Sequence, residues 1–137
     1  TMVHLVTLLE ALPVQETADA IAELQANDLR IGAVVVNRAN VGFLPDAARA
    51  DAAKGTVDVE QVRKGLDKAG ITLSEDDFAG LITETIEHSA RLEAQDVSAA
   101  DLAEVDAARM YLPALAEGVD LGGLYELAGI LSEQGVR

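Results

Sequence analysis

The sequence contains no cysteine and only two histidines, His4 and His88. Without cysteine the chain has no disulfide and no thiolate for metal binding, redox chemistry or nucleophilic attack. Two histidines so far apart in sequence give no histidine cluster either. The composition therefore argues against metal or thiol chemistry within these 137 residues.

Basic residues and long apolar runs are also scarce. Ten Lys and Arg stand against 24 Asp and Glu, which gives a formal net charge of −14. Such a chain is repelled by nucleic-acid phosphates and anionic membranes, so we expect no nucleic-acid partner. No apolar run approaches the roughly 20 residues of a membrane span, and no basic segment leads a signal peptide. We therefore expect a cytoplasmic protein without a membrane span.

Half of the residues are hydrophobic, and they follow an α/β pattern from the start of the chain. Residues 2–8 and 31–37 are continuous apolar runs typical of buried strands. Residues 14–27 between them carry apolar side chains near helical spacing. This order predicts a right-handed βαβ unit with parallel strands. Within the first strand we expect His4 to be a packed imidazole rather than a catalyst.

The middle of the sequence is weaker in pattern and then helical. Residues 39–56 contain Gly, Pro, Asn, Ala and scattered charge, which suggests a mobile excursion of the chain away from the sheet. A helical stripe follows over residues 59–69, and Gly70 caps it. Ser74 and Asp77 resemble a capping box that opens a longer helix to about residue 92. Ser98 and Asp101 suggest a separate short helix to about residue 108.

The last part returns to the strand and helix pattern. Residues 110–115 predict a third strand that leaves the ladder at Pro113, and Asp120 predicts the cap of a final helix ending near Gly135. The fold class is therefore α/β, with a partial parallel sheet of about three strands flanked by helices. We divide the chain into a β-α-β core segment (1–38), a mainly helical insertion (39–108) and a final strand and helix (109–137).

Two polar residues follow the predicted strands. Ligands of open α/β sheets collect outside the carboxyl ends of strands, and the Asn37 amide could offer a donor and an acceptor to an adenine edge there. Asn37 could equally close a turn. Glu10, on the same rim, could bind a ribose hydroxyl or a partner subunit, or be an exposed loop carboxylate.

A phosphate-binding loop is missing from the sequence. No GxxxxGK[ST] occurs, and Gly122-Gly123, followed by Leu124 without a nearby lysine, is better explained by close packing at a helix start. Without that loop the chain cannot hold the Mg²⁺ and the β- and γ-phosphates as P-loop enzymes do. We therefore expect no catalytic residues for ATP hydrolysis here.

Three motifs in order resemble one family. Residues 5–17 (LVTLLEALPVQET), 34–38 (VVVNR) and 111–121 (YLPALAEGVDL) are similar to the late strand, the adenine-contacting Asn strand and the adenine loop of the arsenical-pump-driving (anion-transporting) ATPases. That family also contains the tail-anchored-protein-targeting ATPases. The Ala-rich, acidic composition is nearest to its actinobacterial branch. The resemblance covers roughly residues 3–38 and 110–133.

The resemblance implies the C-terminal portion of a P-loop ATPase fold that binds ATP. Asn37 would then bond the adenine, with Glu10 near the ribose or a subunit interface. Pro113, Leu115 and Ala116 would pack against the base. Upstream residues outside this chain would hold Mg²⁺, so the segment alone would not hydrolyse ATP.

The same resemblance implies partners. They are the upstream half of the ATPase, a second copy or a paralogue in a dimer, and a possible protein client on the helical insertion. The chain lacks the Cys-x-x-Cys zinc staple of the targeting branch. The client-binding helices of that branch are Met-rich, which lets a groove adapt to varied apolar segments, whereas this chain has no methionine between Met2 and Met110. We therefore expect neither zinc-clamped dimerisation nor tail-anchor capture.

Two other functions stay open from the residues alone. The chain could be a non-enzymatic interaction domain whose helices dock a protein partner. It could also be a complete small enzyme that uses carboxylates such as Glu10 and Asp120, although no constellation of residues supports that alternative. Separated from neighbouring strands, such a sheet is expected to self-associate or to be unstable.

Overall fold

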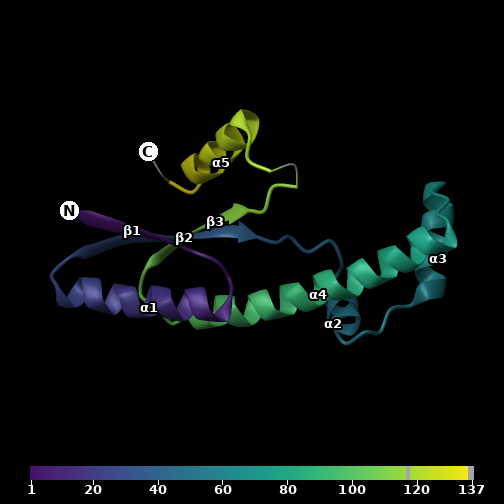
Figure 1. Ribbon diagram of the computed structural model, residues 1–137, viewed down its shortest axis with the longest axis horizontal. Helices are drawn as coiled ribbons and strands as arrows, with labels where there is room; N and C mark the ends of the chain where they lie inside the picture. Colours follow the sequence, from purple (N-terminus) through teal and green to yellow (C-terminus); the bar gives the residue numbers. More distant parts are fainter. Residues whose placement is uncertain (117, 136–137) are drawn as a thin grey trace. The chain divides into compact units, whose positions relative to one another are not determined.

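The computed structural model in Figure 1 describes residues 1–116 and 118–135, and it is an α/β fold. Within these residues three parallel strands form one sheet in the order β1-β2-β3, with helices around it. The predicted fold class is confirmed. The elements in chain order are β1 (Met2–Thr7), α1 (Ala11–Ala26), β2 (Arg30–Ala39), α2 (Asp46–Ala53), α3 (Val59–Ala69), α4 (Glu75–Ala103), β3 (Ala108–Pro113) and α5 (Leu121–Glu133).

The chain forms two compact units. The first combines Thr1–Val41 with Ala94–Arg137, and it holds the sheet, α1, α5 and the end of α4. The second is Gly42–Glu93, which holds α2, α3 and most of α4. The helical segment expected at 39–108 contains this second unit.

One face of the sheet carries the core of the first unit. Val34 and Val36 of β2 are fully buried, and they cluster with Val14 and Ile21 of α1 and with Leu102 near the end of α4. Alternation along the strand places Val34 and Val36 on the same face, where α1 covers them. Of the apolar residues that predict α1 from the sequence, Val14 and Ile21 are on its buried side, together with Thr17.

The opposite face of the sheet is covered only in part. Figure 1 shows α5 on the side away from α1, and α5 contacts β3. On that face of β1, Met2 is 52% and Val6 68% exposed, and His4 is exposed as well. The prediction that His4 is a packed imidazole is wrong, because no described element covers this face of β1.

A bulge interrupts the ladder between β2 and β3. Val36 pairs with Tyr111 and Ala39 pairs with Pro113, so β2 has one more residue than β3 between these pairs. Arg38 lies in this interval in the left-handed conformation, with φ of 54°. Bulges re-aim side chains and occur often beside functional sites. Asn37 and Arg38 are the two residues of β2 within this irregularity.

The second unit confirms the predicted caps. Gly70 ends α3 in the left-handed conformation at φ 71°. At the start of α4 the Asp77 N–H donates to Ser74 Oγ (3.1 Å), and the Ser74 hydroxyl donates to Asp77 Oδ2 (2.7 Å). These hydrogen bonds satisfy groups that have no partner within the helix.

The middle of the chain differs from the sequence predictions at two places. Residues 39–56, predicted as a mobile excursion, contain the helix α2 from Asp46, where Ala-rich sequence favours helix and an acid stands in the first turn. No new helix begins at Ser98. It is buried inside α4, which runs without a break to Ala103, so tertiary packing overrides the capping preference of serine.

Candidate functional site

The carboxyl ends of β2 and β3 lie side by side and form the centre of the candidate site. The Ala114 N–H donates to the Ala39 carbonyl at 3.1 Å, one residue beyond the Ala39–Pro113 pair. Asn37 is half-buried two residues before Ala39. Asn37 is thus on the same sheet edge as the loop that follows Pro113.

The loop after β3 lines a cavity of about 340 Å³. Volumes of roughly 300–1,000 Å³ are usual for small-molecule sites. Its lining includes all three loop residues that the sequence suggests for an adenine contact. The lining residues are Pro113, Ala114, Leu115, Ala116, Gly118, Asp120, Gly123 and Glu126. Glu117, which belongs to the same predicted loop, is outside the described residues.

The start of α5 fixes this loop. Asp120 caps the helix as predicted, since its Oδ1 accepts from the Gly123 N–H at 2.8 Å. Gly123 is buried, and a Cβ there would lie 2.9 Å from Leu115 Cδ1 and 3.3 Å from the Gly118 carbonyl oxygen. The close-packing explanation of Gly123 is therefore confirmed, and the missing side chain lets Leu115 settle against the helix.

Alternation along β2 bears on which way Asn37 faces. Val36 is in the core, so regular alternation would place Asn37 on the opposite face, but Ala39 also packs against the core, and the alternation is broken in the bulge between them. The face opposite the core is the side on which α5 and its preceding loop lie (Figure 1). A half-buried amide on this side has both hydrogen-bonding groups to offer to a planar base.

Glu10 is on the same rim but is not brought into the cavity. It is exposed, precedes α1 and makes no side-chain cap hydrogen bond. It follows β1, and β2 stands between β1 and β3. The structure therefore brings Pro113, Leu115 and Ala116 together in one cavity at the end of β3. Asn37 is near the end of the adjoining strand but is not among the residues that line this cavity, and Glu10 follows the strand beyond it.

Gln134, after α5, has a structural role that the sequence reading misses. Its Oε1 accepts from the Tyr111 N–H (2.8 Å), and its Nε2 donates to the Tyr111 carbonyl (2.9 Å). At the outer edge of β3, the Gln134 amide thus makes the two hydrogen bonds that a neighbouring strand would make with Tyr111. A glutamine 23 residues away gives no sequence signal for this contact.

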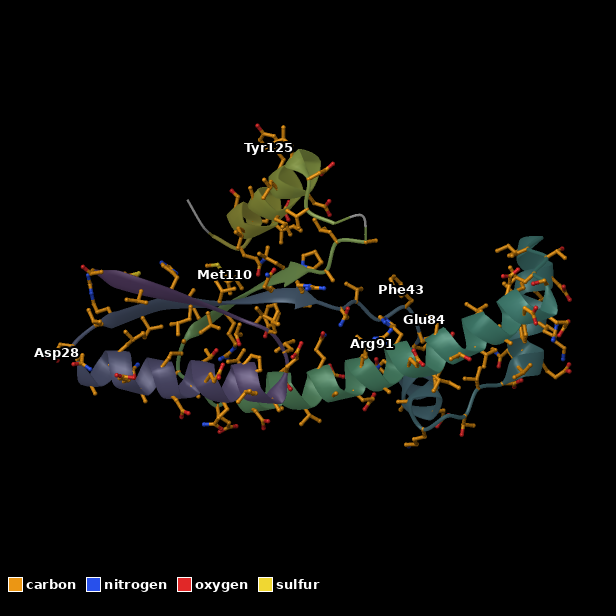
Figure 2. The ribbon with its side chains drawn as sticks, viewed as in Figure 1. Asp28, Phe43, Glu84, Arg91, Met110 and Tyr125 are labelled. Atoms are coloured by element: carbon orange, nitrogen blue, oxygen red, sulfur yellow. The ribbon has the colours of Figure 1, made fainter. Side chains whose placement is uncertain are left out.

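The second unit has a separate apolar hollow on α4. It has a volume of about 310 Å³ and is lined largely by Phe43, Leu44, Leu81 and Leu92. Phe43 is 85% exposed and stacks on His88, with ring centroids 5.9 Å apart. Figure 2 shows Phe43 near Glu84 and Arg91 of α4, which form an ion pair with each other.

Arg63 joins α3 to the start of α4. Its guanidinium forms two hydrogen bonds with Glu75, the shorter at 2.7 Å, and lies 3.9 Å from the centre of the Phe78 ring. The hydrogen bond from Arg63 lowers the pKa of the Glu75 carboxyl, and the same bond raises the pKa of Arg63. Both groups are solvent-exposed, so this contact links α3 to α4 locally and adds little to the free energy of unfolding.

Among residues 1–116 and 118–135, no group of three or more His, Asp or Glu side chains could hold a metal ion. In the same part of the chain, no helix has the length and apolar character needed to cross a membrane.

Comparison with known proteins adds a relationship. The chain is 52% identical over 137 residues to ATPase BagA of Mycobacterium tuberculosis, and the match covers 100% of this chain and 40% of that protein. A Mycobacterium bovis protein, also named as an ATPase, matches with the same identity and coverage. The chain is related to proteins named as ATPases. It spans about two fifths of the length of these curated relatives. No protein-family model matches it.

Proposed function

We propose that this chain forms the adenine side of the nucleotide site of an anion-transporting-type ATPase. The observation that carries the proposal is the hydrogen bond between Ala114 and Ala39, which brings the loop cavity to the strand edge of Asn37. The ATPase names of relatives at 52% identity support it.

In this proposal the base enters the cavity beside Pro113, Leu115 and Ala116. These small and apolar side chains suit the flat faces of a purine, and the Asn37 amide bonds its edge. We propose that Glu10, which follows the neighbouring strand, meets a more distant group such as a ribose hydroxyl or an adjoining subunit.

The remaining parts of ATP would be held elsewhere. The sequence has no phosphate-binding loop, so polypeptide outside this chain would supply the phosphate and Mg²⁺ ligands. We accordingly propose that the chain alone binds adenine nucleotides weakly and does not hydrolyse ATP, in the cytoplasm, as part of a dimeric enzyme.

The helical unit is proposed to meet a protein client. Phe43 is almost fully exposed above an apolar hollow, and Val59, Ile71 and Leu73 are exposed around α3. Exposed apolar groups of this kind favour protein contacts. The same observation favours the second candidate function, a docking domain without nucleotide chemistry.

A hybrid protein tests the nucleotide site. This chain would replace the matching part of ATPase BagA, and the Kd for ATP would be measured by calorimetry. Losing one hydrogen bond of about 1–1.5 kcal/mol predicts about a tenfold weaker Kd for Asn37→Ala. Asn27→Ala, at the far end of α1, is the matched control and should leave the Kd unchanged.

The two candidate functions predict different results. A Kd for ATP that is the same with and without the Asn37 amide favours the docking domain over the nucleotide site. Strong Mg²⁺-dependent ATP hydrolysis by the 137-residue chain alone would contradict the proposal that polypeptide outside this chain supplies the phosphate and Mg²⁺ ligands.

A further inference from the structure

Glu126 lines the loop cavity from the second turn of α5. Its side chain is exposed, and within residues 1–116 and 118–135 no group forms a hydrogen bond or an ion pair with its carboxylate. The residue stands beyond the first turn of the helix, so the helix dipole does not account for an acid there. The Glu126 carboxylate is therefore available to a ligand in the cavity.

Asp120, the other acid in the lining, already has a structural role. Its Oδ1 accepts from the Gly123 N–H at 2.8 Å and caps α5. A ligand that took this oxygen would compete with the helix cap. Of the two carboxylates, Glu126 is the one that can bind a ligand without loss to the fold.

The side chains of the lining offer acceptors and no donors. The described lining residues other than these two acids are proline, alanine, leucine and glycine. An ionised carboxylate accepts hydrogen bonds and donates none. A ligand group that brings its own N–H donors is thus the group that these side chains can satisfy.

Four of the eight described lining residues bring no available backbone donor either. The N–H groups of Ala114, Gly118 and Gly123 each donate to an acceptor of the protein, at 3.1, 3.3 and 2.8 Å. Pro113 has no N–H. The cavity is therefore rich in acceptors as a whole, which disfavours a phosphate or a carbonyl oxygen in it.

The two common purine bases differ at this point. Adenine carries an amino group at position 6, with two N–H donors, whereas guanine carries a carbonyl oxygen there. A carboxylate can accept from the amino group and is repelled by the carbonyl oxygen. Guanine has donors of its own at N1 and N2, so the two bases make different demands on one carboxylate.

We propose that the Glu126 carboxylate accepts a hydrogen bond from the 6-amino group of adenine, which makes Glu126 a specificity-determining residue of the nucleotide site. This inference rests on the proposed function, since it starts from the base in the loop cavity. The Asn37 amide can present either its oxygen or its nitrogen to a base by rotating, whereas Glu126 can only accept. Glu126 is therefore the group that distinguishes an amino group from a carbonyl oxygen.

Nucleotide affinity of the hybrid with ATPase BagA tests the inference in a double-mutant cycle. Calorimetry gives the Kd for ATP and for purine riboside 5′-triphosphate, which lacks the 6-amino group. Glu126→Ala removes one charge-assisted hydrogen bond to ATP alone, so the ratio of the two Kd values should fall about tenfold. Both ligands carry the same triphosphate, so the lost negative charge changes both Kd values alike and leaves their ratio.

A control variant is available on the same helix. Glu133 is exposed at the other end of α5, and Glu133→Ala makes the same change of charge. The ratio of the two Kd values should be unchanged in this variant. Melting temperatures of both variants close to that of the parent hybrid would show that the fold is retained.

Two results would overturn the inference. One is an equal ratio with and without the Glu126 carboxylate. The other is a hybrid that binds GTP more tightly than ATP and loses this preference in Glu126→Ala, because the carboxylate would then bind the N1 and N2 donors of guanine.

Asn37→Ala separates this inference from the proposed function. If it weakens the Kd for ATP while Glu126→Ala leaves the ratio unchanged, only the role of Glu126 is wrong. If neither variant alters the Kd for ATP and the hybrid binds both ligands equally, adenine is not bound in this cavity and the proposed function fails as well.

Discussion

A Cβ atom at Gly123 would lie 2.9 Å from Leu115 Cδ1, which makes the start of α5 the support of the cavity loop. Gly123→Ala must move Leu115 or the nearby Gly118 carbonyl, whereas the same change at Gly129 meets no atom within 4 Å. We expect Gly129→Ala to raise the free energy of unfolding by about 0.5–1 kcal/mol, and Gly123→Ala to lower it by about 1 kcal/mol because of crowding. Urea denaturation measures both. Equal stabilisation by the two changes would show that the close contact is absent.

Arg109 should anchor the end of α4. Its Nη1 donates to the carbonyls of Val105 (2.9 Å) and Leu102 (3.3 Å), which also accept the backbone N–H groups of Ala107 and Val105 in the turn after α4. Arg109→Met keeps most of the aliphatic length and removes both bonds, so we expect a loss of about 1–2 kcal/mol in the free energy of unfolding. Arg30→Met, exposed at the start of β2, should change it by less than about 0.5 kcal/mol. Similar losses for both variants would point to net charge instead of the two bonds.

Gln134 should determine how well the edge of β3 is closed. Gln134→Ala removes both bonds to Tyr111, and we expect faster exchange of the Tyr111 amide and more aggregation in concentrated samples. Gln134→Glu keeps an acceptor for the Tyr111 N–H but cannot donate to its carbonyl, so its effect should be intermediate. Gln25→Ala on α1 serves as the control. If Tyr111 exchanges at the same rate in every variant, the edge is protected in another way.

The Arg63–Glu75 contact should weaken in acid. Because the folded pKa of Glu75 lies below its ordinary value, the contact stabilises at pH above the unfolded value and is lost as pH falls through the folded pKa. Protection of the α3 amides should therefore fall below about pH 4.3, and Glu75→Gln should remove this dependence. Asp76→Asn, at the next position, is the control. Retention of the acid transition in Glu75→Gln would assign it to another carboxyl.

The sequence predicts those parts of the structure that depend on short-range chemistry. Gly70 ends α3, Ser74 caps α4 and Asp120 caps α5. Each contacts only residues at most four positions away, and each cap is where its sequence pattern predicts it. The two continuous apolar runs and the helical spacing between them predict the βαβ segment, and Val34 and Val36 of the second run are buried with Val14 and Ile21 of the helix that follows β1.

What the sequence does not predict depends on contacts between distant residues. Ser98 looks like a helix start, but its burial within α4 overrides that preference. The exposed state of His4 depends on which elements cover the sheet, and no local pattern contains that information. For the candidate site, the sequence suggests the loop residues, whereas the approach of Ala114 to Ala39 requires the register of β2 against β3.

The extra residue between Val36 and Ala39 makes the length of this segment as important as its composition. Side chains alternate along a strand, so deletion of one residue there would rotate either Asn37 or Ala39 through half a turn about the strand axis. Because the side chain of Arg38 is exposed, most substitutions there are tolerated, except β-branched residues and proline, which its left-handed backbone at φ 54° disfavours. A change in spacing is not tolerated in this way. Related chains that share this loop should therefore tolerate replacement at position 38 far more readily than insertion or deletion.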